Sequence, residues 1–333
     1  MPVLEVENLK TYFYTLRGIV KAVDNVSFTV ERGEIMGLAG ESGCGKSTVA
    51  WSLLGLVPPP GRIVDGSIRI DGMDITRMSE AEIRRKIRWS KISMVFQGAM
   101  NALSPVHRVG DQIIEPLLIH KGMEKSEAYS IAEDLVQQVG LPPEILKRYP
   151  HELSGGQKQR IVIAMALIME PDIIIADEPT TALDVIVQGQ IINLLKSISK
   201  KKGISIIIIS HDLSVIAEMA DKVAIMYAGK IVEYGPSEKI FKEPQHPYTQ
   251  LLLRAIPRLH GVKEKLIYIP GSPPDLRNPP RGCRFHPRCP YVMDVCRVEE
   301  PPLFQVGHQH YSACWLNKES GVAATKALEE AKA

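Results

Sequence analysis

Residues 40–48 of this 333-residue chain read Gly40-Glu41-Ser42-Gly43-Cys44-Gly45-Lys46-Ser47-Thr48. A short apolar run precedes them and apolar residues at helical spacing follow, so the pattern predicts a strand, a glycine-rich turn and a helix. In such a unit the backbone N–H groups of the turn and the positive end of the helix dipole hold the phosphates of a nucleotide. We expect Lys46 to reach the β- and γ-phosphates and Ser47 to bind Mg²⁺. We call residues 40–48 the phosphate loop.

A second run of sequence supplies two carboxylates. Residues 173–178 read Ile173-Ile174-Ile175-Ala176-Asp177-Glu178. Four apolar residues that end in two acids predict a central parallel strand whose carboxyl end reaches a ligand crevice. We expect Asp177 to hold Mg²⁺ through its water shell. Glu178 is placed to act as a general base or to polarise the water that attacks in line with the γ-phosphate.

The segment Leu153-Ser154-Gly155-Gly156-Gln157, here called the signature segment, opens a predicted helix with an apolar face. Its N-terminal amides and Ser154 predict a second anion site. One chain cannot easily wrap both anion sites around a single triphosphate. We therefore expect a two-fold dimer in which each phosphate loop faces the signature segment of its partner.

With these motifs in this order, residues 1–258 resemble the ATP-binding subunits of ABC transporters. The resemblance implies an α/β fold: an ABC-type P-loop NTPase core with an antiparallel β subdomain and a helical subdomain inserted at about residues 98–170. It also implies roles for further residues. Gln97 senses Mg²⁺ and the attacking water, Asp184 crosses the dimer interface, and His211 contacts the γ-phosphate. Phe13, or its neighbour Tyr12, stacks on adenine.

Together, the motifs and the resemblance predict a complete site for ATP and Mg²⁺. The catalytic residues are Glu178, His211 and Gln97, and Mg²⁺ is held through Ser47, Gln97 and Asp177. ATP contacts Phe13, the phosphate loop from Gly40 to Thr48, Gln97 and His211. The partner subunit completes the ATP site with Ser154, Gly155, Gly156, Gln157 and Asp184.

The remaining residues, 259–333, are expected to form a small irregular extension rich in proline and cysteine. Three segments in and before it resemble the dipeptide and oligopeptide importers: His246-Pro247-Tyr248-Thr249, Gly271-Ser272-Pro273-Pro274 and Phe285-His286-Pro287-Arg288-Cys289-Pro290. The chain departs from that pattern at Gly98-Ala99, where the subfamily more often has Asp-Pro. The same subfamily includes importers of small oligosaccharides, so the cargo stays open between peptide and oligosaccharide.

Four of the five cysteines, Cys283, Cys289, Cys296 and Cys314, lie in this extension. Clustered thiols in a cytosolic chain favour a metal site over disulfides, with free thiols as the remaining alternative. Four thiolates suit either Zn²⁺ or an iron–sulfur cluster. The gaps are longer than those of zinc knuckles, and members of the resembled subfamily carry a [4Fe–4S] cluster here. The expected role is structural, because a proline-rich segment has little core of its own.

Composition narrows the class of partner. A net charge of +2 argues against wholesale binding of nucleic acid. No apolar stretch approaches the roughly 20 residues that span a bilayer, and no secretory signal is visible. We therefore expect an ATP-hydrolysing subunit, peripheral to the cytoplasmic face of the cell membrane. Its partners would be two transmembrane permease subunits, a second ATP-binding subunit (identical or paralogous) and, indirectly, an extracellular solute-binding protein.

Two other functions are alternatives to this one. A soluble ABC-type ATPase that acts on ribosomes or DNA usually carries tandem cassettes or a long coiled-coil insertion, and this chain has neither. A regulatory subunit that binds ATP without hydrolysing it is disfavoured by the intact Glu178 and His211.

Overall fold

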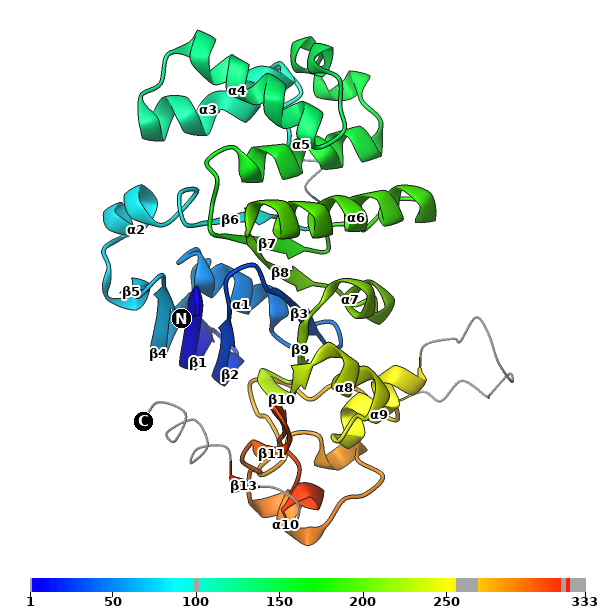
Figure 1. The fold of residues 1–333 in the computed structure, drawn as a ribbon. Coiled ribbons are helices and arrows are strands. Elements are labelled where there is room, and N and C mark those ends of the chain that lie inside the picture. Colours follow the sequence, from blue (N-terminus) through cyan, green and yellow to red (C-terminus); the bar gives the residue numbers. More distant parts are fainter. Residues whose placement is uncertain (1, 99–101, 256–268, 319–321, 324–333) are drawn as a thin grey trace. The chain divides into compact units, whose positions relative to one another are not determined.

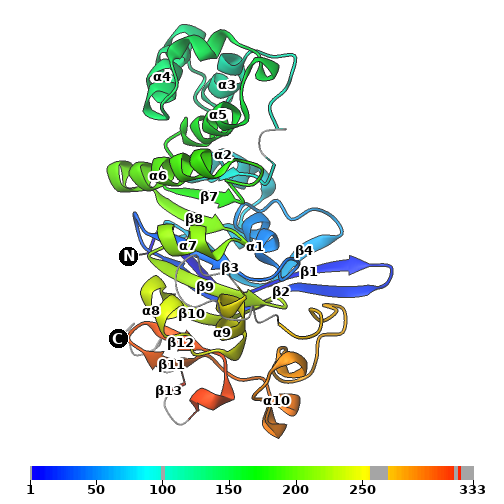
Figure 2. The same cartoon turned by 90° about the vertical axis from the view of Figure 1, so that its right-hand side faces the viewer.

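The computed structural model describes residues 2–98, 102–255, 269–318 and 322–323. The contacts among Cα atoms divide the chain into two compact units. The first unit comprises Met1–Leu4, Val30–Ile35 and Arg69–Ile208, and the second comprises Glu5–Thr29, Met36–Ile68 and Ile209–Ala333. Each unit is built from segments far apart in the sequence and is described by itself (Figures 1 and 2).

The first unit combines a small parallel sheet with helices. Its elements are β5 (Met73–Asp74), α2 (Glu80–Lys86), β6 (Ile92–Val95), α3 (Val109–Lys121), α4 (Lys125–Gln138), α5 (Gly155–Leu167), β7 (Ile173–Asp177), α6 (Val185–Lys202) and β8 (Ser205–Ile209). Strand β7 lies between β8 and β6. Every residue of these three strands is buried, as apolar runs in central parallel strands require.

Helices α3, α4 and α5 lie side by side in both views (Figures 1 and 2). The helical spacing of apolar residues in α4 explains this packing, because the buried side chains share one face of the helix: Ala128, Ala132, Leu135 and Val136. The Ser93 hydroxyl in β6 donates to the Ala166 carbonyl near the end of α5, at 2.7 Å. This bond fixes the end of α5 on the sheet of the same unit.

The second unit holds the remaining strands. Its elements are β1 (Leu4–Thr15), β2 (Gly18–Val30), β3 (Ile35–Ala39), α1 (Lys46–Leu53), β4 (Gly61–Ile70), α7 (Leu213–Met219), β9 (Lys222–Tyr227), β10 (Lys230–Pro236), α8 (Ser237–Lys242), α9 (Pro247–Arg254), α10 (Asp294–Val298), β11 (Phe304–Gly307), β12 (His310–Ser312) and β13 (Val322–Ala323). Strands β1 and β2 form a long hairpin that is clearest in Figure 2. Strand β1 lies between β2 and β4.

A mixed sheet carries the rest of the second unit. Strand β3 pairs in parallel with β9, and β9 pairs with β10 in the antiparallel sense. The sheet then continues through the extension, because β12 pairs with β10, with Glu233 opposite Ser312. Strands β11 and β13 follow at the edge. In its described residues, 269–318 and 322–323, the extension is therefore mostly irregular but adds short strands to the sheet of this unit.

The structure confirms the expected mixture of α/β elements with parallel and antiparallel sheets. Among the described residues, no helix is long and apolar enough to cross a membrane.

Candidate active site

The phosphate loop leaves the carboxyl end of β3, where Ala39 lies opposite Ile225 of the parallel strand β9. Gly45 is the N-cap of α1, which begins at Lys46, so the last three residues of the phosphate loop form the first turn of this helix. The Gly229 N–H donates to the Cys44 carbonyl at 2.8 Å and so fixes the loop backbone. The predicted order of strand, glycine turn and helix is therefore confirmed.

Two glycines of the phosphate loop cannot be replaced without a clash. Gly40 has φ +147°, and a Cβ there would lie 2.2 Å from the Met226 carbonyl oxygen. Gly45 has φ +111°, and its Cβ would lie 2.2 Å from the Ala22 carbonyl oxygen. Both the left-handed backbone and the close approach of neighbouring strands thus require glycine.

The side chain of Lys46 folds back over the loop and is only 8% exposed. Its Nζ donates to the carbonyl oxygens of Gly40 at 2.7 Å and Glu41 at 3.1 Å. The Cys44 Sγ lies 3.7 Å from the same nitrogen, and burial raises the pKa of the Cys44 thiol. The ammonium group is thus held at the centre of the loop, where a nucleotide phosphate would replace the carbonyl oxygens as its partner.

The phosphate loop also has partners that the sequence patterns did not indicate. The Glu41 carboxylate pairs with Arg288, and the Glu41 N–H donates to the Tyr248 hydroxyl at 2.9 Å. Both partners lie in segments that had been quoted only for their resemblance to a subfamily. The sequence shows only an arginine within a proline-rich segment, and nothing in its neighbourhood indicates Glu41 as the partner.

In the first unit, Gln97, Asp177 and Glu178 lie at or just after the carboxyl ends of two neighbouring strands. Strands β6 and β7 run in parallel with Val95 opposite Ala176, so Gln97 and the Asp177-Glu178 pair come off the same edge of the sheet. Asp177 is 3% exposed, whereas Gln97 is exposed. This edge can present one amide and two carboxylates to a metal ion and a water molecule.

The backbone turns sharply after β7. Glu178 has φ 52°, which is uncommon outside glycine, and Thr181 donates its hydroxyl hydrogen to Glu178 Oε2 at 2.9 Å. Such backbone strain is retained where the surrounding structure fixes it, and it is frequent at functional sites.

The signature segment begins α5 as the sequence predicted. Ser154 is the N-cap: its Oγ accepts from the Gln157 N–H at 3.3 Å, and Gln157 Oε1 accepts from the Ser154 N–H at 3.0 Å. This reciprocal pair is a capping box, which leaves other N-terminal amides of the helix available to an anion. A Cβ on Gly156 would lie 2.7 Å from Val187 Cγ1 in α6.

Asp184 caps α6 by accepting from the Val187 N–H at 3.0 Å, and Val187 is the residue of α6 that Gly156 of the signature segment approaches. The next two residues, Val185 and Ile186, are 84% and 75% exposed. The first unit thus presents Ser154, Gly156 and Asp184 together with two exposed apolar side chains.

The last candidates lie in the second unit. His211 is exposed and follows β8, and Asp212 beside it caps α7 by accepting from the Ser214 N–H at 2.9 Å. Phe13 on β1 is half-buried and packs on Gly61, where a Cβ would lie 2.6 Å from its ring. The Tyr12 hydroxyl donates to Asp24 at 2.7 Å, and burial together with this bond raises the pKa of Tyr12.

The four cysteines of the extension line one pocket, together with side chains that include His286 and Trp315. All four are free thiols. Burial raises the pKa of Cys283 to about 11 and that of Cys314 to about 12. Within the described ranges, no group of three or more His, Cys, Asp or Glu side chains is arranged to hold a metal ion. The thiols are thus gathered but do not form a ready-made ligand set.

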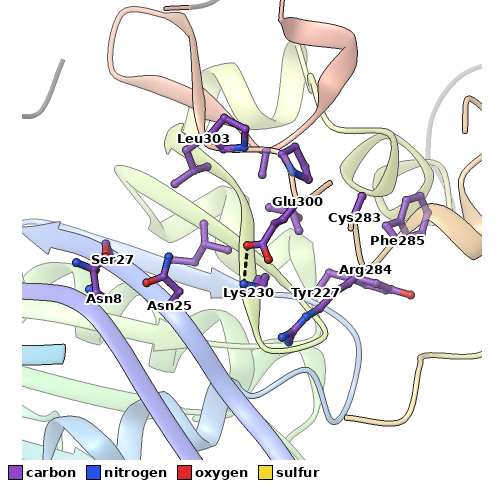
Figure 3. A pocket seen from close by; sticks show the side chains of 15 residues that line it. Asn8, Asn25, Ser27, Tyr227, Lys230, Cys283, Arg284, Phe285, Glu300 and Leu303 are labelled. Carbon is purple, nitrogen blue, oxygen red and sulfur yellow. Dashed lines mark hydrogen bonds and ion pairs between the residues drawn. The ribbon is translucent and has the colours of Figure 1, made fainter. Parts of the chain in front are cut away.

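A separate cavity of about 240 Å³ lies between the β1–β2 hairpin and the extension (Figure 3). Asn8, Asn25 and Ser27 line it from the hairpin, and the Lys230–Glu300 ion pair, 2.6 Å long, crosses it. Tyr227 is also in its lining. The extension therefore packs on the hairpin incompletely, with polar groups around the gap.

Two family models match this chain, and three relatives described below align with 94% to 96% of it. The family model described as ABC transporter matches residues 23–181, and the model described as oligopeptide/dipeptide transporter, C-terminal region, matches residues 232–296. The dipeptide transport ATP-binding protein DppD of Bacillus subtilis is 50% identical over 94% of this chain and 94% of its own length. The oligopeptide transport ATP-binding protein AppD of the same species is 46% identical over 96% of this chain and 98% of its own. DppD of Escherichia coli is 44% identical over 94% and 96%.

Solved structures agree on the fold. A dimeric bacterial ABC transporter cassette matches with a TM-score of 0.63 and 28% identity, over 70% of this chain and 98% of that one. The same cassette in a post-hydrolysis state, bound to ADP and Pi, matches with a TM-score of 0.62. The fold is that of an ABC ATPase cassette, and the chain belongs to the ABC transporter family of ATPases.

Proposed function

We propose that this chain is the ATP-hydrolysing, energy-coupling subunit of an importer of dipeptides or oligopeptides. The phosphate loop, with Lys46 held over it, is the observation that carries the proposal. The peptide cargo is supported by the match of the C-terminal region and by the names of the relatives. An importer of small oligosaccharides with the same ATPase subunit is the second candidate, and a soluble ABC ATPase is a weaker third.

Each candidate residue would have its own role in ATP hydrolysis. The amides of the phosphate loop and Lys46 bind the phosphates, while Ser47, Gln97 and Asp177 hold Mg²⁺. Glu178 accepts the proton of the attacking water, and His211 contacts the γ-phosphate. Phosphoryl transfer needs little covalent help from a protein, so placement and charge stabilisation supply most of the catalysis. Adenine stacks on Phe13, because the Tyr12 hydroxyl is already engaged by Asp24.

We propose that the ATP site is completed by a second ATP-binding subunit, identical or paralogous. That subunit contributes its signature segment and its Asp184. The exposed Val185 and Ile186 beside Asp184 support an interface there, because covering adjacent apolar side chains removes them from water and lowers the free energy of the complex. Two transmembrane permease subunits would convert closure of the dimer into transport at the cytoplasmic face of the membrane. An extracellular solute-binding protein would deliver the cargo.

The four cysteines of the extension are candidate metal ligands. We propose that Cys283, Cys289, Cys296 and Cys314 bind a [4Fe–4S] cluster, with Zn²⁺ as the alternative. Four thiolates suit either group, and all four cysteines line one pocket. Their sulfur atoms would have to move closer together to bind one cluster or one ion. A bound cluster would cross-link the extension. Anaerobically purified protein should be brown with about four irons per chain, and colourless protein with one zinc would overturn the cluster.

The Glu178→Gln substitution tests the ATPase proposal. It should leave ATP binding intact, lower the turnover at least a hundredfold, and trap a nucleotide-bound dimer. The matched control is Glu144→Gln, which neutralises an exposed carboxylate of the same unit and should hydrolyse ATP like the parent. Near-parental hydrolysis by Glu178→Gln would refute the assignment of the base.

The cargo is tested with the complete transporter in vesicles. ATP hydrolysis and uptake should be stimulated by labelled dipeptides or oligopeptides in the presence of the solute-binding protein. Stimulation by oligosaccharides alone would replace the peptide assignment with the second candidate.

A further inference from the structure

Glu41, the second residue of the phosphate loop, is held at both its carboxylate and its backbone by residues that follow β10. Arg288 donates from both terminal nitrogens, at 2.7 Å to Glu41 Oε2 and 3.0 Å to Glu41 Oε1. Tyr248 of α9 accepts the Glu41 N–H at 2.9 Å. The Glu41 carbonyl oxygen, in turn, accepts from Lys46 Nζ at 3.1 Å. One residue of the loop thus joins the extension to the lysine that would bind phosphate.

The Arg288 side chain has little freedom to move. It is 6% exposed, and its Nε donates to the Pro270 carbonyl at 2.7 Å. One terminal nitrogen also reaches the Tyr227 hydroxyl at 3.3 Å. Burial by itself lowers the pKa of Arg288, but the bonds to Glu41 and Tyr227 outweigh burial and raise that pKa. A buried, bidentate arginine–carboxylate pair is geometrically specific, so it fixes the orientation of Glu41.

The aromatic side chains around this pair make a rigid support. Tyr227 and Tyr248 lie with ring centroids 4.7 Å apart, and Phe285 of the extension contacts both, at 5.1 Å and 5.4 Å. All three side chains are at most 1% exposed. Arg288 and Tyr248 therefore hold Glu41 from within a packed core, not from a loose surface segment.

The position of the Glu41 charge gives this contact a consequence for the nucleotide. A carboxylate within a loop that receives a triphosphate opposes the binding of that anion unless a cation neutralises it. Arg288 supplies the cation and also keeps the carboxylate turned toward the extension. Loss of Arg288 would leave a partly buried, uncompensated negative charge next to the phosphates.

We propose that Arg288 is a positioning residue of the nucleotide site: it acts through Glu41 to hold the phosphate loop and to neutralise its carboxylate. The inference rests on the proposed role of the phosphate loop in binding ATP. Through this contact, the cysteine-rich extension contributes to nucleotide affinity without touching the nucleotide.

Arg284 provides the matched control. It is as buried as Arg288, at 8% exposed, and lies in the same segment. Its partners are the Ala228 carbonyl and Asp24, both outside the phosphate loop. Arg284→Gln should therefore loosen the extension as much as Arg288→Gln, yet it removes no bond to the loop.

The test is a double-mutant cycle on the full-length chain. ATP dissociation constants are measured by calorimetry for the parent, Arg288→Gln, Glu41→Gln and the double variant. Arg288→Gln should weaken ATP binding about tenfold, which corresponds to about 1.4 kcal/mol. In the Glu41→Gln background the same change should have an effect of less than about twofold, because no carboxylate remains to be positioned or neutralised.

Two further measurements separate positioning from folding. Arg288→Lys, which keeps the charge but not the bidentate geometry, should recover part of the affinity. In ATPase assays of Arg288→Gln, KM should rise while kcat changes little. Arg284→Gln should lower the melting temperature but retain ATP affinity.

Parental ATP affinity in Arg288→Gln, an equal effect of Arg288→Gln with and without Glu41, or an equal loss of affinity in Arg284→Gln would each overturn the inference. Lys46→Ala distinguishes this failure from failure of the proposed function. If Lys46→Ala also binds ATP like the parent, the phosphate loop is not the ATP site. If Lys46→Ala loses ATP and Arg288→Gln does not, only the inference fails.

Discussion

The stability of the protein should fall on acidification because of one buried histidine. His246 is 1% exposed and caps α9, with its Nδ1 accepting the Tyr248 N–H at 3.0 Å. Burial lowers the pKa of His246 to about 4, against smaller opposing effects of the Glu233 carboxylate and the Ala313 carbonyl. The imidazole is thus neutral in the folded protein, and protonation of Nδ1 would break the cap.

The neighbours of His246 define the local charge. Glu233 of β10 is fully buried and accepts from the backbone N–H groups of Gln245 and His246. It also bonds to His310 Nε2 of β12 at 2.8 Å. Phe285 packs against the His246 ring at 5.9 Å. One carboxylate therefore serves several hydrogen-bond partners and does not offset the cost of burying a charged His246.

The sign and the magnitude follow from linkage. Between pH 6.5 and about pH 4 the unfolded chain binds a proton at His246 and the folded chain does not. Proton binding therefore lowers the free energy of the unfolded state relative to the folded state as the pH falls, and stability is lost through this window. A difference of about 2.5 pKa units corresponds to about 3 kcal/mol, of which about 2 kcal/mol is lost by pH 5.

His246→Asn isolates this contribution. Asparagine is a good N-cap, so the substitution keeps an acceptor for the Tyr248 N–H but removes the titrating group. Urea unfolding followed by tryptophan fluorescence at pH 7.5, 6.5, 5.5 and 5.0 gives the free energy of unfolding of both proteins. The parent should lose about 2 kcal/mol relative to the variant between pH 7.5 and pH 5. A difference that does not change with pH would refute the reasoning.

Five substitutions test other features. Gly45→Ala should destabilise the chain by about 2 kcal/mol or more in urea unfolding, because it adds a backbone clash to left-handed strain. Gly43→Ala, with φ +77° and open space around its Cβ, should lose only about 1 kcal/mol. Ser154→Ala and Ser79→Ala each remove a helix cap worth about 1 kcal/mol, yet only Ser154→Ala should lower ATP hydrolysis, by about tenfold or more. Equal activities of these two variants would contradict the role of the signature segment. Cys314→Ser should lower the iron content of anaerobic protein, and unchanged iron would exclude Cys314 as a ligand.

Local sequence was sufficient for the parts of the site that local chemistry builds. The glycine pattern of the phosphate loop predicts its turn because each left-handed position favours glycine. The serine and glutamine of the signature segment predict the start of α5 at Gly155, because together they form a capping box. The apolar run before Asp177 predicts a buried central strand for the same kind of reason.

Long-range contacts could not be predicted in this way. Arg288 and Glu41 are 247 positions apart, and no periodicity relates them. Strand β12 has three residues, which is too short for an alternation of apolar and polar residues to be recognised. The gathering of four cysteines around one pocket agrees with their clustering in the sequence, but their spacing could not give the positions of the sulfur atoms.

The pairing of β10 with β12 has a practical consequence for any shortened form of this chain. Residues 1–258 would carry the motifs of the ATPase but would leave one side of β10 without its neighbour. The bare N–H and C=O groups of an uncovered strand invite pairing with other chains, and so promote aggregation. The same truncation would remove the hydrogen bond between His310 and Glu233. It would also remove the ion pair between Arg288 and Glu41 of the phosphate loop. A cassette trimmed to its motifs is therefore a poor reagent, and the cysteine-rich tail should be kept in expression and crystallisation work.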